Sequence, residues 1–374
     1  MTSLRILADD LTGALDCAAA FGPGMPVHLG HPASEAPQGL DIVATATRDV
    51  PLQALAGDLA ACLPWLRGAA VAFKKVDSLL RGNTFDEVDW LARQAGFAGL
   101  AMVPAFAAQG RITRGGQQWW SSPGGGLLAV QPAIDEALQS RGWQVDSGPA
   151  LPVGNAPMAW VPDVCDDAAM DAVAAQVLQN ASAAGTPRWL WCGSAGLAHA
   201  LARCGPVRGA DFSAHSVGPM ASASTAGPLL LISASHHAVT RGQWQVLRQS
   251  AWAGACQHVD DVPLWAADAP ALLLDLAAQD TLSPEAAAAL LAQQVGTIAA
   301  HAARPRSLVV IGGDTLLALC RALGAQGLTS GQPLGRPGWG CARMRGGRWD
   351  GLVCHTRSGA FGGPDDVLQV LNQL

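Results

Sequence analysis

Short apolar runs alternate along this chain with longer segments whose apolar positions repeat with the period of a helix. The apolar runs predict strands at Leu4–Ala8, Asp41–Ala46, Val71–Phe73, Leu100–Val103, Trp189–Cys192, Leu229–Ile232, Leu308–Ile311 and Leu352–His355. The helical period predicts helices at Leu52–Leu66, Ala168–Gln179, Val239–Ser250, Pro284–Ala302 and Thr315–Leu323. Strands that are apolar throughout are typical of a parallel sheet covered by helices on both faces. The alternation of strand and helix therefore indicates an α/β fold with right-handed crossovers.

A stretch of glycine, proline and small polar residues, Gly205–Pro228, interrupts this pattern. It divides the chain into segments of roughly 210 and 150 residues, each of domain size. We therefore predict a linker here, with one domain over residues 1–210 and another over residues 226–374. Each is expected to hold a mostly parallel sheet flanked by helices, with the ligand cleft between the domains. A second patch without periodicity, Gly115–Gly126, contains Trp119 and Trp120 and is typical of an insertion or a lid.

Composition excludes several classes of protein. The chain has 374 residues, of which 14% are charged, and its net charge of -6 argues against a nucleic-acid binder. It shows no apolar run suited to a signal peptide or a membrane span. Its nine cysteines include no CxxC pair, which favours reduced thiols over disulfides or a zinc site. We expect a cytoplasmic protein that binds neither nucleic acid nor membrane. The sequence does not decide whether it forms a homo-oligomer.

The basic residues are unusual, because all but Lys74 and Lys75 of the 23 are arginine. One interpretation is a compositional bias against lysine. The other is that one of these lysines does what arginine cannot, since a compact ammonium and a planar guanidinium differ in chemistry. Neither lysine follows a glycine-rich loop, which excludes a P-loop nucleotide site.

Carboxylates follow the first predicted strand directly, at Asp9 and Asp10. Ligands of open α/β sheets gather at the carboxyl ends of strands. Two adjacent carboxylates there suit a general base or a magnesium ligand. The alternative is that Asp10 or Thr12 caps the following helix.

The densest polar segment follows the strand at Val71–Phe73. It supplies the candidate substrate-binding residues Lys74, Lys75, Ser78, Arg81, Gly82 and Asn83, together with Asp77 as a candidate catalytic residue. Because strand residues alternate between faces, at most one of the two lysines should face a given pocket. Arg48 and Arg111 also follow predicted strands, and with Arg81 they would concentrate positive potential in one cleft. The alternative is a solvated turn with internal ion pairs.

The C-terminal part contains strand ends rich in small residues, which suit a nucleotide. Glycine turns leading into a helix point backbone N–H groups at an anion. The candidate nucleotide-binding residues are Ser233, Ser235, Gly312, Gly313, Asp314, Thr315, Ser358, Gly359, Ala360 and Gly362. Ordinary tight turns are the alternative. The neighbouring His236 and His237 lack the spacing of a metal site, and a surface role is favoured.

Six segments resemble, in chain order, the four-carbon acid sugar kinase family: ILADDLTGALDCA, KKVDSLLRGN, PAFAAQGRIT, GSAGLA, GGDT and RSGAFG. The resemblance spans nearly the whole chain. It implies an N-terminal substrate domain and a C-terminal ATP-binding domain. It also implies transfer of the γ-phosphoryl group of ATP, with Mg²⁺, to the terminal hydroxyl of a tetronate or 3-oxo-tetronate.

The resemblance also implies roles for the residues singled out above. Asp9 or Asp10 would accept the hydroxyl proton, with Asp77 in reserve, and Arg48, Lys75 and Arg81 would bind the carboxylate. The chain departs from the family where Ser233–Thr240 replaces SGSCSPVT, and where Arg357 and Leu79 replace a lysine and a threonine. The segment Gly115–Gly126 is also unfamiliar. The alternative function is a catalytically weakened relative that binds a sugar acid or nucleotide for sensing or assembly.

Overall fold

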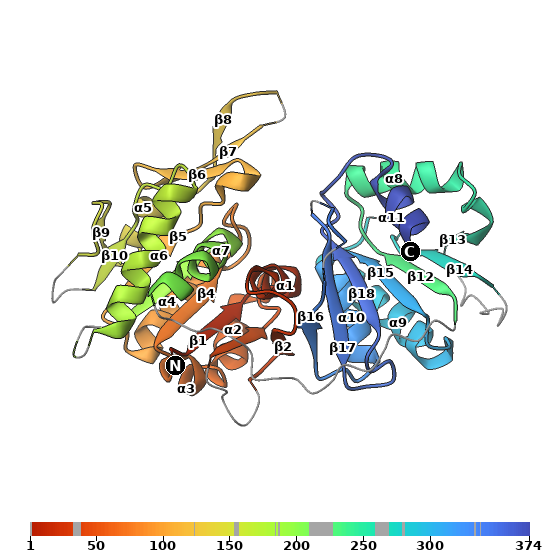
Figure 1. Ribbon diagram of the computed structural model, residues 1–374, viewed down its shortest axis with the longest axis horizontal. Coiled ribbons are helices and arrows are strands. Elements are labelled where there is room, and N and C mark those ends of the chain that lie inside the picture. The colour runs from red at the N-terminus through yellow and green to blue at the C-terminus, as the bar shows by residue number, and fades with distance from the viewer. Residues whose placement is uncertain are drawn as a thin grey trace. The chain divides into compact units, whose positions relative to one another are not determined.

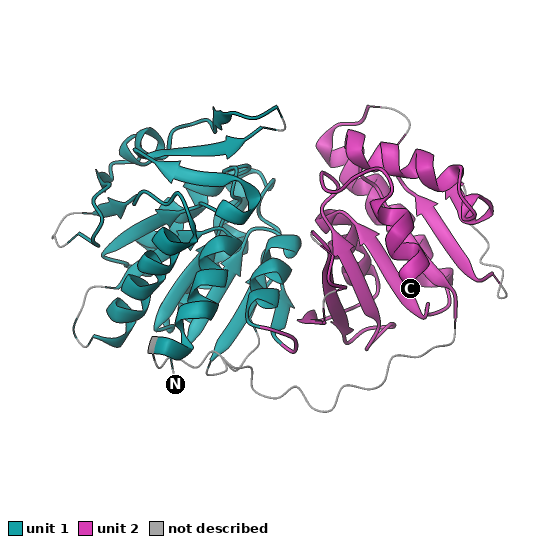
Figure 2. Cartoon of the chain, turned by 45° about the horizontal axis from the view of Figure 1, so that its top comes forward, with its two compact units in different colours: residues 1–21, 25–216 teal, residues 22–24, 217–374 magenta. Residues whose placement is uncertain are grey.

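The computed structural model describes residues 2–32, 39–122, 124–152, 157–183, 185, 188–208, 227–258, 269–278, 281–332, 334–336 and 338–374. The chain forms two compact units (Figure 2). Unit 1 contains Met1–Phe21 and Met25–Ser216, and unit 2 contains Gly22–Gly24 and Val217–Leu374. Most of the predicted linker Gly205–Pro228 lies outside the described residues, so its bounds and those of the two domains stay a prediction.

Unit 1 is built on a parallel sheet with the strand order β2-β3-β1-β4-β11-β5-β10-β9 (Figure 1). The strands are β1 (Leu4–Ala8), β2 (Pro26–Leu29), β3 (Leu40–Ala44), β4 (Val71–Lys75), β5 (Gly99–Val103), β9 (Gln144–Asp146), β10 (Met158–Trp160) and β11 (Trp189–Gly193). Three further strands, β6 (Arg111–Arg114), β7 (Gln117–Ser121) and β8 (Leu127–Ala129), form a small antiparallel sheet. The helices are α1 (Leu11–Ala20), α2 (Leu52–Ala60), α3 (Leu63–Arg67), α4 (Thr84–Ala95), α5 (Ile134–Gln139), α6 (Asp167–Ser182) and α7 (Ala195–Cys204).

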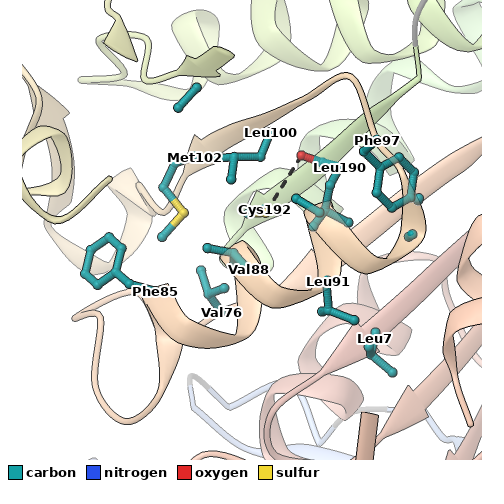
Figure 3. Packing of buried hydrophobic residues seen from close by; sticks show 14 of the residues in the cluster. Leu7, Val76, Phe85, Val88, Leu91, Phe97, Leu100, Met102, Leu190 and Cys192 are labelled. Atoms are coloured by element: carbon teal, nitrogen blue, oxygen red, sulfur yellow. Dashed lines mark hydrogen bonds between the residues drawn. The ribbon is translucent and has the colours of Figure 1, made fainter. Parts of the chain in front are cut away.

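The core of unit 1 fills both faces of this sheet. On one face, side chains of α2, α3, α4 and α5 pack against strand residues such as Leu7, Leu100 and Leu190 (Figure 3). The side chains of Ile6 and Phe73 alternate to the other face and are equally buried. In unit 1, helix α7 packs against both α1 and α6. The apolar strands thus take the doubly covered environment that their composition predicts.

Unit 2 repeats this architecture on a smaller scale, with the strand order β13-β14-β12-β15-β18-β17-β16. All neighbours are parallel except those of β17, which runs antiparallel to both β16 and β18. The strands are β12 (Leu229–Ser233), β13 (Cys256–His258), β14 (Ala271–Asp275), β15 (Ser307–Ile311), β16 (Gly327–Ser330), β17 (Gly340–Arg345) and β18 (Val353–Arg357). The helices are α8 (Ala238–Arg248), α9 (Pro284–His301), α10 (Gly313–Ala322) and α11 (Asp366–Gln373). Trp244 of α8 and Val370 of α11 pack against the sheet in one core.

Most predicted strands and helices are confirmed, and one predicted helix is wrong. The helix predicted at Leu52–Leu66 is two helices, α2 and α3, because Pro64 cannot donate a backbone hydrogen bond and instead stands in the first turn of a new helix. The aperiodic patch Gly115–Gly126 contains β7 and the turn from β6 into β7, and its role as an insertion or a lid stays a prediction. The described helices include none that is long and apolar enough to cross a membrane.

One charged pair lies inside the core of unit 1. Lys74 on β4 and Glu87 on α4 form an ion pair, and both side chains are almost fully excluded from solvent. We expect Lys74→Met to destabilise the protein by about 3–5 kcal/mol, because it leaves the Glu87 charge buried without a partner. Urea unfolding followed by tryptophan fluorescence measures this loss. The double variant Lys74→Met with Glu87→Leu should recover most of the lost stability. A Lys74→Met variant that unfolds at the same urea concentration as the wild type would contradict the expectation.

Candidate active site

The carboxyl end of β1 lies where the order of strands in unit 1 reverses. β1 lies between β3 and β4: the chain adds β2 and β3 on one side of β1 and then crosses to add β4 on the other side. Open α/β sheets bind their ligands at such a switch point. Asp9 and Asp10 follow β1 directly, and Lys75 and Asp77 stand at the end of β4. The topology therefore brings together residues that are far apart in the sequence.

Arg48 joins the carboxylates at this switch point. Its Nε donates to Asp9 Oδ2 at 2.7 Å, and one terminal nitrogen donates to Asp9 Oδ1 at 3.1 Å and to Asp10 Oδ1 at 2.7 Å. Its other terminal nitrogen lies 3.7 Å from Asp77 Oδ2. One guanidinium thus contacts all three candidate catalytic residues.

The charges at this site fix one another's ionisation. Burial by itself would raise the pKa of Asp9, but Arg48, Lys75 and Lys74 outweigh it, so the pKa is lowered. Burial would likewise raise the pKa of Asp77, and the hydrogen bonds and charge of Arg81 together with Arg48 lower it well below its usual range. The carboxylates of Asp9 and Asp77 are therefore ionised at neutral pH.

Asp10 has a structural function and also keeps one oxygen open. It is the N-cap of α1, where Oδ1 accepts the backbone N–H of Gly13 at 3.1 Å. The same oxygen accepts the hydrogen bond from Arg48. Oδ2 makes no hydrogen bond with the described residues, and the side chain is 17% exposed. Capping and chemistry, the two interpretations of this aspartate, are therefore compatible.

The two lysines lie on opposite faces of β4, as strand alternation predicts. Lys74 points into the core against Glu87 and does not join Asp9, Asp10 and Arg48. Lys75 is 5% exposed and lies against the first turn of α1, where a side chain at Gly13 would overlap its ammonium group. Burial would lower the pKa of Lys75, but Asp10 and Asp9 raise it, so this ammonium stays charged.

Two further candidate arginines, Arg81 and Arg111, extend the site. Arg81 makes two hydrogen bonds with Asp77, at 3.1 and 2.6 Å, and its side chain is 62% exposed. Arg111 donates to Ser78 Oγ at 2.5 Å. Sequence reasoning missed Gln118, which is fully buried and donates to the carbonyl oxygen of Ser78 at 2.8 Å.

Gly82 and Asn83 support the site without facing it. Asn83 Nδ2 donates to the carbonyl oxygens of Thr47 and Val50, at 3.1 and 2.7 Å, and so holds the loop that carries Arg48. Gly82 has φ +72°, and a side chain there would overlap the backbone of Arg48. Both residues thus position Arg48.

In unit 2, the switch point lies between β12 and β15. Gly312, with φ +107°, ends β15, donates to the carbonyl oxygen of Arg357 at 2.8 Å and caps α10, which begins at Gly313. Thr315 is buried, and Asp314 is exposed in the first turn. The hydroxyl groups of Ser233 and Ser235 each accept the N–H two residues later, at 3.3 Å, so both order the loop after β12. In that loop His237 caps α8 and is exposed.

The glycine loop after β18, residues 358–363, is anchored on α8 by buried side chains that sequence reasoning missed. Thr240 Oγ1 donates to the carbonyl oxygen of Gly359 at 2.7 Å. Gln243 Nε2 donates to the carbonyl oxygens of Phe361 and Gly363, at 3.2 and 2.8 Å. The carbonyls of Gly359 and Phe361 share their peptide units with the N–H groups of Ala360 and Gly362. In a planar trans peptide the N–H points opposite to the C=O, so these two N–H groups point away from α8. Neither N–H group has an acceptor among the described residues.

Arg357 lies beneath this loop. It forms an ion pair with Asp366 of α11, donates to Gln243 Oε1 at 2.5 Å and stacks over Trp339, with 4.9 Å between its guanidinium carbon and the ring centroid. Burial lowers its pKa, although Asp366 raises it. The residue that replaces the family's usual lysine is thus 1% exposed, and it supports the loop from inside.

The comparisons agree with the division into two units. A family model described as a sugar-binding N-terminal domain matches residues 4–140, and one described as a nucleotide-binding C-terminal domain matches residues 250–367. A D-threonate kinase from Bordetella bronchiseptica is 29% identical, covering 99% of this chain and 97% of its own length. The chain belongs to the four-carbon acid sugar kinase family. It is a kinase that acts on a hydroxyl group.

One further relative and two solved structures are also similar to this chain. A D-threonate kinase from Cupriavidus necator is 41% identical over 124 residues, which is 30% of this chain and 29% of that protein. Among solved structures, a Salmonella typhimurium LT2 protein has a TM-score of 0.72 at 18% identity and covers 100% of both chains. A Haemophilus influenzae protein has a TM-score of 0.64 at 16% identity and covers 99% of both chains. These two structures share the fold of this kinase.

Proposed function

We propose that this kinase transfers the γ-phosphoryl group of ATP to the terminal hydroxyl of a four-carbon sugar acid of the D-threonate type. The observation that carries the proposal is the cluster of Asp9, Asp10, Arg48 and Lys75 at the switch point of unit 1. It offers carboxylates to a hydroxyl and fixed cations to an anion, within the part of the chain that the sugar-binding family model matches. Two relatives that carry the name D-threonate kinase give the substrate class.

Asp10 is the base in this proposal. Its Oδ2 is open, whereas both oxygens of Asp9 bind Arg48 and both oxygens of Asp77 bind Arg81. As the hydroxyl oxygen attacks the γ-phosphorus, the bond to the β-phosphate oxygen breaks, ADP leaves and Asp10 takes the hydroxyl proton. Asp9 holds Arg48 in place, and Asp77 holds Arg81.

The lysine at the site has a complementary function. Lys75 places a permanent positive charge against the first turn of α1, where the helix dipole adds to it. Such a site suits the transferred phosphoryl group, because phosphoryl transfer depends mostly on positioning and charge neutralisation. Lys75 is therefore the lysine to which we assign chemistry.

The nucleotide is assigned to unit 2. The phosphate chain of ATP would accept from the N–H groups of Ala360 and Gly362, with the turn Gly312–Thr315 as a second anchor. The described residues contain no group of three side chains suited to a metal ion. Mg²⁺ commonly takes one or two carboxylates together with substrate phosphates. We therefore assign Mg²⁺ to the ATP complex, where it would neutralise phosphate charge.

The test is product formation from ATP, Mg²⁺ and a panel of D-threonate, erythronate and 3-oxo-tetronate. We expect ADP and a phosphorylated sugar acid with at least one member, identified by mass spectrometry. Nucleotide binding with no phosphorylated product would contradict the proposal. It would instead favour a binding module, in line with the exposed His236 and His237 that replace the family's usual residues.

A further inference from the structure

The four candidate cations at the site in unit 1 differ in how far nearby carboxylates balance their charges. Arg48 is paired with Asp9 and Asp10, and Arg81 with Asp77. The charge of Lys75 is balanced by the nearby Asp10 and Asp9. Arg111 forms no ion pair with a carboxylate in the described part of the chain, and the nearby Asp77 is already paired with Arg81 and Arg48. One of its terminal nitrogens donates to Ser78 Oγ and to Gln109 Oε1, each at 2.5 Å, and both of these partners are neutral.

The position of Arg111 is fixed by buried contacts. It begins β6, which pairs with β7 in the small sheet. Gln118 on β7 donates to the carbonyl oxygens of Ser78 and Pro104, at 2.8 and 3.3 Å, and accepts from Thr113 Oγ1 at 2.7 Å. Both Gln118 and Thr113 are fully excluded from solvent. The small sheet therefore sets Arg111 beside the end of β4, where Ser78 lies.

This arrangement leaves donors open for an anion. Only one terminal nitrogen of Arg111 is engaged by the described residues, so Nε and the second terminal nitrogen remain. Because Ser78 Oγ accepts from Arg111, its own hydroxyl proton is free to donate. A carboxylate has two oxygens and fits a guanidinium edge together with a hydroxyl group.

We propose that Arg111, together with Ser78, binds the carboxylate of the sugar acid and sets the preference of the enzyme for an acid. The inference rests on the proposed function. It replaces the predicted carboxylate-binding residues Arg48, Lys75 and Arg81 with Arg111, the one candidate substrate-binding arginine that forms no ion pair with a carboxylate. Arg48 and Arg81 then serve to hold Asp9, Asp10 and Asp77.

The experiment compares D-threonate with D-threonamide, its neutral amide, in steady-state kinetics. Wild type should prefer the acid in kcat/KM. Arg111→Gln should lower kcat/KM for the acid by about 10- to 100-fold, the value of a hydrogen bond to a charged group, and leave the amide nearly unchanged. Arg111→Lys keeps the positive charge but loses the planar guanidinium, so its kcat/KM for the acid should lie between those of wild type and Arg111→Gln. Arg114→Gln, an exposed arginine on the same strand, is the matched control.

The outcomes separate this inference from the proposed function. If Arg111→Gln has the same ratio of kcat/KM for the acid to kcat/KM for the amide as wild type, the assignment of Arg111 is overturned. If wild type phosphorylates no sugar acid, the proposed function fails. Calorimetric titration of wild type and Arg111→Gln with D-threonate then still tests the inference. Equal affinity of the two proteins overturns it, and a weaker affinity of the variant supports it.

Discussion

Asp10→Asn should lower kcat by about 10²- to 10⁴-fold, the usual contribution of a general base. Asparagine is as good an N-cap as aspartate, so the hydrogen bond to Gly13 and the start of α1 should persist. Only the ability to accept a proton is lost. Steady-state kinetics with saturating ATP and D-threonate measure the effect, and urea unfolding checks that the fold is unchanged.

The chain offers a matched control for this substitution. Asp166 caps α6 in the same unit, where its side chain accepts the N–H of Ala169 at 2.8 Å. Asp166→Asn makes the same chemical change at the same kind of position, outside the candidate site, and should leave kcat unaltered. If Asp10→Asn is equally active, Asp10 is only a cap, and the base must be sought at Asp9.

Gly362→Ala should raise the KM for ATP by more than about 10-fold. The residue has φ +82°, which disfavours a side chain, and its Cβ would overlap both Asp366 and the guanidinium of Arg357. The loop of residues 358–363 must then move, and the N–H groups of Ala360 and Gly362 lose their direction. Calorimetric titration with ATP should show weaker binding, while D-threonate binding to unit 1 should be unchanged.

The neighbouring residue gives the comparison. A Cβ at Gly363 would meet nothing within 4 Å, so Gly363→Ala should bind ATP like wild type. Equal ATP affinity in Gly362→Ala and Gly363→Ala would show that the glycine loop is not part of the nucleotide site.

Local patterns in the sequence predict much of this fold. Apolar strands and helical periods depend on neighbouring residues, so β1, β12 and β15 could be placed to within a residue or so. The opposite directions of Lys74 and Lys75 follow from strand geometry alone. The candidate residues Asp9 and Asp10 could be found because they end a strand, and the switch point then explains why that strand matters.

Long-range pairing is what the sequence does not reveal. The polar segment after β4 predicts that Lys74 is a candidate substrate-binding residue, but its partner Glu87 comes from α4 with no local signal. Gln118 and Gln243 look like ordinary surface glutamines until the fold buries them against backbone carbonyls. In each case a polar side chain is satisfied by a segment distant in sequence.

The burial of both lysines also affects how the protein meets reactive chemistry. Lys74 is 0% and Lys75 is 5% exposed, so the side chains on the folded surface present no readily accessible amine. Acylating metabolites, reducing sugars and enzymes that modify lysine therefore find no accessible lysine side chain on the folded enzyme. Positive charge elsewhere is carried by arginine, whose guanidinium keeps its proton and resists acylation. The folded enzyme should therefore react with such reagents much more slowly than the unfolded chain, in which both lysines are accessible.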